Sequence, residues 1–224
     1  MPTGVPIPAI RDRLFDAAER VLVRDGPDAL TSRAVTTEAG VAKGILHRHF
    51  VDFDTFLAAL VLTRIERLDT RSETLRACAG TAAVVDNIAG ALAATLDPTA
   101  TAIVSLVCSR HALLDRLRLT TPTGIPLLTE TTRMIAAYLT AERGLGRIPL
   151  ETDVDSLAVL LVGGAHLLTA GRGDTPPDAD DLRDLATSVI ASHQQPHRRA
   201  RAQPSGRRRA ETATSTTTAR LDNR

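Results

Sequence analysis

Apolar positions recur three or four residues apart along most of the chain, which is the spacing of one face of an α-helix. Over residues 9–24 they form a single stripe, which Asp25, Gly26 and Pro27 terminate. No alternating strand pattern persists anywhere, so the chain is predicted to be all-α. Further helices are expected over residues 53–76, 81–98, 99–117, 127–144, 154–168 and 178–192.

Residues 31–50 have a different pattern, which predicts two short helices joined by a tight turn. Val35 and Ala39 lie on one face of the first helix, and Gly40 can adopt the left-handed conformation that ends it. The second helix is expected over residues 42–49 and returns apolar groups to the same side. This arrangement is a helix-turn-helix, whose second helix enters the major groove of DNA.

The outward positions of this motif combine small residues with long hydrogen-bond donors. Small side chains let a helix lie deep in the groove, while Lys and Arg reach phosphates or guanine edges. Thr31 is also placed to cap the first helix, and His49 and Phe50 to hold the second against its neighbours. The predicted DNA-binding residues are Thr31, Ser32, Arg33, Ala42, Lys43, Gly44, His47, Arg48 and His49.

The same stretch, TSRAVTTEAGVAKGILHRHF, resembles the DNA-binding signature of TetR-type transcriptional regulators. The resemblance covers about the first 60 residues closely, and beyond them only the helical plan matches. It implies an all-α protein, in which an N-terminal three-helix helix-turn-helix head joins a helical ligand-binding and dimerisation domain. Two positions depart from the pattern, because His47 replaces a Tyr and Phe53 replaces a Lys that touch phosphate in relatives. Fewer backbone anchors, and pH sensitivity from His47, are therefore expected.

The resemblance further implies a sequence-specific transcriptional regulator: a homodimeric repressor that a small-molecule effector releases from a palindromic operator. A helical dimer that binds DNA constitutively, without an effector, is the alternative. A third interpretation, an all-helical enzyme or lipid-binding protein with a degenerate head, is disfavoured. The chain shows no nucleophile with a nearby base, no paired catalytic carboxylates, no phosphate-binding glycine loop and no metal-ligand spacing. We therefore expect no catalytic residue, no metal and no cofactor.

The formal net charge of +1 is unevenly distributed. Residues 196–224 hold eight Arg against one Glu and one Asp, a net charge of +6. Residues 1–195 therefore carry a net charge of −5. DNA binding is therefore inferred from the local motif and not from overall basic charge. The tail is too polar to fold, and it either attracts DNA without sequence preference or has no specific role. The expected boundaries are a flexible arm 1–8, a DNA-binding domain 9–52, a helical domain 53–194 and a disordered basic tail 195–224.

Two apolar segments near the end of the helical domain predict an interface between subunits. Residues 154–168 are apolar on nearly all faces, and residues 178–192 add a helical stripe. A helix-turn-helix protein needs two copies about 34 Å apart to reach successive major-groove faces. The alternative is a helix buried inside one subunit. The predicted interface residues are Leu160, Gly163, Gly164, Leu167, Leu182, Leu185 and Val189.

The effector site implied by the resemblance is expected among Leu, Val, Ile and Ala side chains of the helical domain. Because only 2% of the residues are aromatic, a small apolar or amphipathic effector fits better than a flat, stacked one. The predicted polar contacts are His111, Arg133, Tyr138 and His166. Solvent exposure is the favoured explanation of Arg133, and a hydrogen bond in the dimer seam is the alternative for His166. Neither secretion nor membrane insertion is indicated, so a location in the bacterial cytoplasm, at the nucleoid when bound to DNA, is expected.

Overall fold

The computed structural model describes residues 7–171 and 177–201, and these ranges contain helices and connecting turns but no strand. The all-α prediction is confirmed. The elements are α1 (Ile7–Asp25), the 3-10 turn η1 (Pro27–Ala29), α2 (Ser32–Glu38), α3 (Ile45–His49), α4 (Phe53–Ala77), α5 (Val84–Thr95), α6 (Pro98–Ser109), α7 (His111–Leu117), α8 (Leu128–Gly144), α9 (Val154–Gly171) and α10 (Ala179–Arg201).

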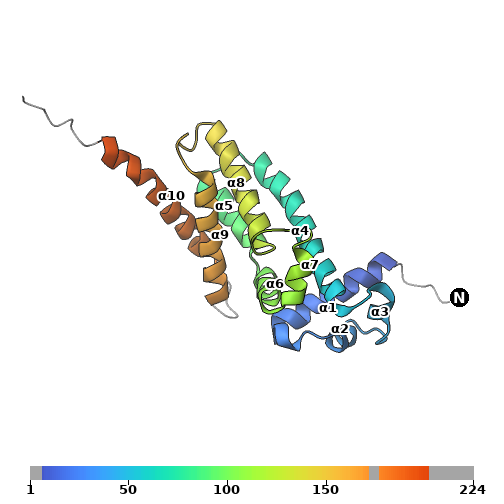
Figure 1. Cartoon of the computed structure of the whole chain (residues 1–224). Coiled ribbons are helices and arrows are strands. Elements are labelled where there is room, and N and C mark those ends of the chain that lie inside the picture. Colours follow the sequence, from blue (N-terminus) through green and yellow to red (C-terminus); the bar gives the residue numbers. More distant parts are fainter. Residues whose placement is uncertain (1–6, 172–176, 202–224) are drawn as a thin grey trace, which may run out of the picture.

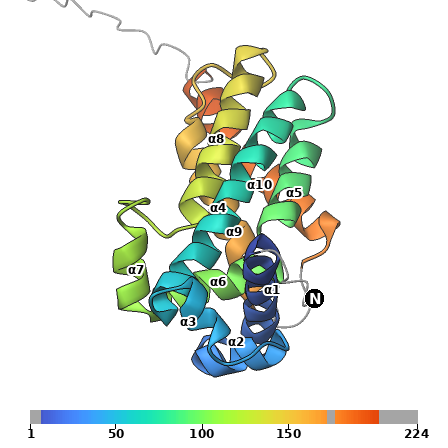
Figure 2. The same cartoon turned by 90° about the vertical axis from the view of Figure 1, so that its right-hand side faces the viewer.

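The molecule is elongated, with α1, α2 and α3 at one end and α9 and α10 at the other (Figure 1). We call the first three helices the head and the remainder the body. The long helix α4 begins beside the head and continues through the body, where it packs along α8. Figure 2, viewed from the side, shows that α7 packs beside α4, close to the head. Helix α4 therefore links the DNA-binding end to the remainder of the fold.

The apolar interior forms two clusters, and the boundary between them does not follow the boundary between head and body. One cluster joins the head and the first half of α4 to α6 and α7, including Ile103, Leu106 and Leu113, each with 0% exposure. The other joins the end of α4 to α5, α8, α9 and α10. The head thus shares a continuous core with α4, α6 and α7 of the body.

Several helix bounds differ from those that the sequence pattern predicts. The second helix of the motif begins at Ile45 instead of residue 42, because Lys43 and Gly44 form a turn that precedes it. The helix expected over residues 99–117 is broken at Arg110, whose backbone is extended. Helix α10 continues beyond Pro196 to Arg201, so residues 195–201 are helical instead of disordered. The remainder of the predicted tail, 202–224, and residues 1–6 of the predicted arm lie outside the described residues.

Helix α9 is the most apolar long helix among the described ranges. By length and composition it could cross a membrane, and α5 with α6, bent by 61°, passes the same test together. In the fold, α9 packs against α8 and α10 through Leu157, Leu161 and Ala165. Only 39% of it is buried, so it leaves a large apolar face uncovered in the single chain.

Candidate nucleic-acid interface

The inner side of the helix-turn-helix is fixed by apolar packing. Val35 of α2 and Leu46 of α3 both have 0% exposure, and Gly40 between them has the left-handed φ of 62° that the sequence predicts. Phe50, directly after α3, packs edge-on against Phe56 of α4, with ring centroids 5.1 Å apart. These contacts hold α3 against α4, so the opposite side of α3 faces outward.

Side-chain caps fix the ends of the short helices. Thr31 Oγ1 accepts a hydrogen bond of 3.1 Å from the Ala34 amide, which confirms the predicted N-cap of α2. The Arg13 guanidinium donates to the Ala39 carbonyl at 2.8 Å, which satisfies a free acceptor at the other end of α2. Asp52 caps α4 by accepting a 2.6 Å bond from the Thr55 amide. The motif is therefore held by hydrogen bonds as well as by its core.

The outer side of the motif presents the side chains that the sequence singles out for DNA contact. Exposed residues are Thr31, Arg33, Ala42, Lys43, Gly44, His47 and Arg48, while Ser32 and His49 are half-buried. Within the described part of the chain, Arg33, Lys43 and Arg48 form no ion pair, so their charges are available to an external anion. All nine predicted residues are thus at least partly exposed to solvent.

The acidic residue of α2 is neutralised from within the head. Glu38 bonds to Arg20 at 2.8 Å and to Arg24 at 3.0 Å. Hydrogen bonds from Arg20 and then from Arg24 lower the pKa of Glu38, so its carboxylate stays ionised and paired. Two arginines of α1 thereby remove an isolated negative charge from the motif, which leaves its outer side favourable to phosphate.

Comparison with known families agrees with this geometry. Residues 14–60, which span the end of the first helix, the complete motif and the start of α4, match the family model described as bacterial regulatory proteins, tetR family. The head of the chain therefore matches the tetR family. Members are DNA-binding regulators, and the chain is accordingly a regulator of this kind and not an enzyme. The TetR-type resemblance drawn from residues 31–50 is thereby confirmed.

Solved structures share the fold of this chain across the head and the body. A TetR-family member from Streptomyces coelicolor A3 is 25% identical, with a TM-score of 0.57, covering 81% of this chain and 98% of that chain. A transcriptional regulator from Rhodococcus sp. Rha1 is 19% identical, with a TM-score of 0.59 and coverage of 83% and 96%. The multidrug binding protein EbrR, complexed with imidazole, is 24% identical, with a TM-score of 0.51 and coverage of 80% and 94%. No curated protein is significantly similar in sequence.

The body of the regulator contains a mostly apolar hollow of about 290 Å³ between α4 and α5, which Met134 of α8 also lines. Gly90 lines it, and a Cβ at this position would meet no atom within 4 Å. The polar residues around the hollow include Arg71, Asp86 and Asn87. The sequence pattern did not single out these three, because an amphipathic helix does not reveal which of its polar residues border a hollow.

The four polar residues predicted to contact an effector do not gather around this hollow. His111 is exposed on α7, and Arg133 is exposed beside Glu130, 3.5 Å away. His166 is half-buried on α9, where burial lowers the pKa of its imidazole, and its Nδ1 has no hydrogen-bond partner in the described part. Tyr138 is fully buried and hydrogen-bonded to neighbouring side chains. The structure thus places these residues on separate elements that do not share one site.

Tyr138 belongs to a buried polar cluster. Its hydroxyl donates to Glu142 Oε1 at 2.5 Å and accepts from Asn87 Nδ2 at 2.9 Å. Glu142, with 0% exposure, also accepts from the Gly80 amide and pairs with Arg147 at 3.2 Å. Burial, and then the bond to Glu142, raise the pKa of Tyr138, so the phenol stays protonated. Because Asn87 lines the hollow, this cluster connects the hollow to the loops that follow α4 and α8.

The predicted interface residues divide between two environments. Leu160 and Leu167 of α9 are 49% and 72% exposed, and Gly163 is exposed beside them. Gly164 faces Leu185 of the same chain, since a Cβ there would lie 2.8 Å from its Cδ1. Leu182 is only 3% exposed, and Leu185 and Val189 pack against the core of the body. Gly164, Leu182, Leu185 and Val189 are therefore packed within one subunit, as the alternative interpretation expects, because α10 covers one face of α9.

Proposed function

We propose that the chain is a sequence-specific DNA-binding repressor, which acts as a homodimer on a palindromic operator and is released by a small-molecule effector. The observation that supports DNA reading is the outer side of the second half of the motif. His47 and Arg48 are exposed on α3, whose inner side is fixed, and Lys43 is exposed in the turn that precedes it. Long donors at these positions can bond to guanine edges or to phosphates, and Gly44 permits close approach. Such a regulator acts in the cytoplasm, at the nucleoid when bound to DNA.

The exposed face of α9 supports the dimer. Val159, Leu160, Gly163 and Leu167 follow helical spacing, and the three larger side chains are 49% to 72% exposed. Covering an apolar stripe of this kind is favourable, and a two-fold axis brings the same stripe of a second copy against it. Helix α9 lies at the end of the molecule opposite the head (Figure 1), so a two-fold contact there would leave both heads uncovered.

The hollow between α4 and α5 supports an effector. Its volume of about 290 Å³ suits a small molecule, and its lining from Leu75, Ala91 and Met134 suits an apolar one. Asn87 donates to Tyr138 and to the Cys78 carbonyl, which leaves its carbonyl oxygen as an acceptor for a ligand donor. EbrR, which has this fold, was solved with imidazole bound. We infer a small amphipathic effector with an apolar body and one hydrogen-bond donor.

DNA reading is tested by selecting bound duplexes from a random pool with the wild-type chain and with residues 1–201, which end with α10. Recovery of one palindrome by both is expected. The Lys43→Ala/Arg48→Ala double variant should lose preference for that palindrome over a scrambled duplex, because it removes two of the donors that face outward. If neither chain enriches a sequence, the repressor function is wrong.

The dimer is tested by Leu160→Arg, which places a charge in the exposed stripe of α9. Sedimentation should change from dimer to monomer while the helical content is retained. The matched control is Val51→Arg, because Val51 is 90% exposed and lies outside this stripe. A Leu160→Arg protein that remains dimeric would place the interface elsewhere.

The effector site is tested by Gly90→Leu, whose side chain enters open space in the hollow. An effector found by screening against the DNA complex should no longer release this variant, although its DNA binding is retained. Ala93→Leu is the control, because Ala93 is exposed on the same helix and does not line the hollow. A screen in which no compound releases the DNA, or in which both variants respond normally, favours constitutive binding or another site.

A further inference from the structure

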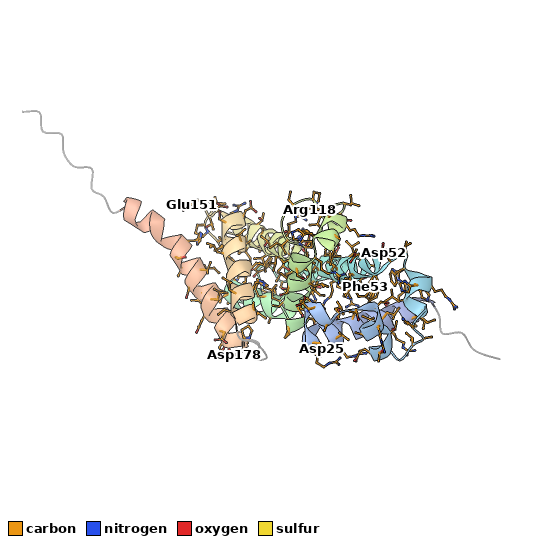
Figure 3. The ribbon with its side chains drawn as sticks, turned by 60° about the horizontal axis from the view of Figure 1, so that its bottom comes forward. Asp25, Asp52, Phe53, Arg118, Glu151 and Asp178 are labelled. Atoms are coloured by element: carbon orange, nitrogen blue, oxygen red, sulfur yellow. The ribbon has the colours of Figure 1, made fainter. Side chains whose placement is uncertain are left out.

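Arginines from outside the helix-turn-helix gather where α3 joins α4. Arg11 comes from α1, Arg110 from the break between α6 and α7, and Arg116 from α7. Their guanidinium groups contact residues 50–55, the segment marked by Asp52 and Phe53 in Figure 3. We call these three residues the arginine rim. The rim brings three positive charges to the segment that directly follows the recognition helix.

Arg110 has the most distinctive place in the rim. Its Nη2 lies 3.1 Å from Asp54 Oδ1, and its Cζ lies 5.6 Å from the centroid of the Phe53 ring. Its backbone is extended and interrupts what would otherwise be one helix. Its side chain is 35% exposed, so the cation is held on a fixed aromatic surface and still reaches solvent. Phe53 is the position at which the sequence lacks the expected cation.

The charges around the junction balance in favour of an external anion. Asp52 and Asp54 on the first turn of α4 would repel a phosphate if they were unpaired. Arg116 bonds to Asp52 at 2.7 Å, and Arg110 pairs with Asp54. Arg11 lies 4.9 Å above the Phe50 ring and forms no ion pair within the described ranges. The arginine rim thus neutralises Asp52 and Asp54, and Arg11 adds one net positive charge.

We propose that Arg110, with Arg11 beside it, contacts the DNA phosphate backbone next to the bases that α3 reads. The guanidinium takes the place of the lysine that is missing at Phe53, although it comes from a helix break 57 residues further along the chain. The contact rests on the proposed binding of duplex DNA. It would add phosphate anchors that carry no sequence information and fix the orientation of the head on the duplex.

The proposal predicts how affinity depends on salt. Each lost phosphate contact makes the slope of log affinity against log salt less steep by about 0.9, so a dimer losing two contacts changes by about 1.8. Arg110→Gln should therefore bind the selected palindrome more weakly, and its deficit relative to wild type should shrink roughly twelvefold between about 50 and 200 mM salt. Arg183→Gln is the matched control, since Arg183 pairs with Asp86 on the distant end of the body.

A second variant separates phosphate contact from mere neutralisation of Asp54. If Arg110 acts only by pairing, Arg110→Gln/Asp54→Asn restores wild-type affinity and slope, and the proposal is wrong. If Arg110 contacts phosphate, the double variant keeps both the loss and the shallower slope. Thermal denaturation of each variant shows whether the head remains folded, and the double variant removes the unpaired acid that could unfold it. Failure of the wild type to bind any duplex would overturn the proposed function and this contact together, whereas failure of Arg110→Gln alone to alter the slope would overturn only the contact.

Discussion

Removing one oxygen atom from the interior of the body gives a sharp test of the buried cluster. In Tyr138→Phe, Glu142 loses a hydrogen bond of 2.5 Å, and Asn87 loses an acceptor 2.9 Å away. A hydrogen bond to a charged group contributes about 1.5–3 kcal/mol, and an unsatisfied buried partner adds to the loss. Asn87 retains the Cys78 carbonyl at 3.3 Å, so the second loss is small. We expect the free energy of unfolding to fall by about 2–3 kcal/mol.

For a chain of this length that loss corresponds to a Tm lower by about 4–12 °C. Circular dichroism at one fixed protomer concentration measures it, because the stability of a dimer depends on concentration. A double-mutant cycle of Tyr138→Phe and Glu142→Gln isolates the interaction between these two side chains. The losses in the free energy of unfolding should differ from additivity by about 0.5–3 kcal/mol. The raised pKa keeps the phenol protonated in the fold, so the contribution is fully present below about pH 10 and declines as pH rises further. A Tm within about 1 °C of wild type would show that the hydroxyl does not support the fold.

Three further changes test the head and its attachment. Gly40→Ala should lower the free energy of unfolding by about 1 kcal/mol in urea denaturation, because its φ of 62° strains any side chain, whereas Gly44→Ala, with φ of −78°, should not. Asp52→Ala should lower the Tm more at pH 7 than at pH 3. Hydrogen bonds, first that from the Thr55 amide, lower the pKa of Asp52, so its contribution is complete above the ordinary pKa of Asp and declines as the pH falls towards the lowered value. Arg64→Met should lower the free energy of unfolding more at pH 7 than at pH 5. Glu19 lies 3.3 Å from Arg64, and burial raises the pKa of Glu19. Without Arg64 the buried Glu19 carboxylate is unpaired, and this cost disappears as the carboxylate is protonated at lower pH. Equal losses at both pH values would contradict either of the last two expectations.

The head could be predicted in detail because its determinants are local. Thr31 caps α2 by accepting a hydrogen bond from the amide of Ala34, three residues later. Gly40 ends the same helix because it can adopt a positive φ. Both follow from a few adjacent residues, as does the outward side of α3. Hydrophobic spacing predicts the start of α3 three residues early, because it does not reveal that Lys43 and Gly44 form a turn.

The body could be predicted only as a set of helices. Tyr138 sits on an apolar helix face, which suits a ligand contact and a buried cluster equally, and its partner Asn87 is 51 residues away. Likewise, an apolar stripe on α10 does not say whether it covers α9 of the same chain or of a second copy. The side chain of Arg110, at the break between α6 and α7, pairs with Asp54, 56 residues earlier. Such contacts arise from packing between helices, which no short pattern encodes.

The core shared between the head and α6 and α7 limits how this protein can be recombined. A fragment that ends at residue 52 would lose the apolar partners supplied by Ile103, Leu106 and Leu113, and would expose the aromatic side chains they cover. A chimaera that transplants the head onto another regulator's body must therefore bring α6 and α7 with it, or rebuild the surface that receives them. For engineering, the exchangeable unit is defined by a buried surface that is discontinuous in sequence, and a cut at the end of the motif would divide it.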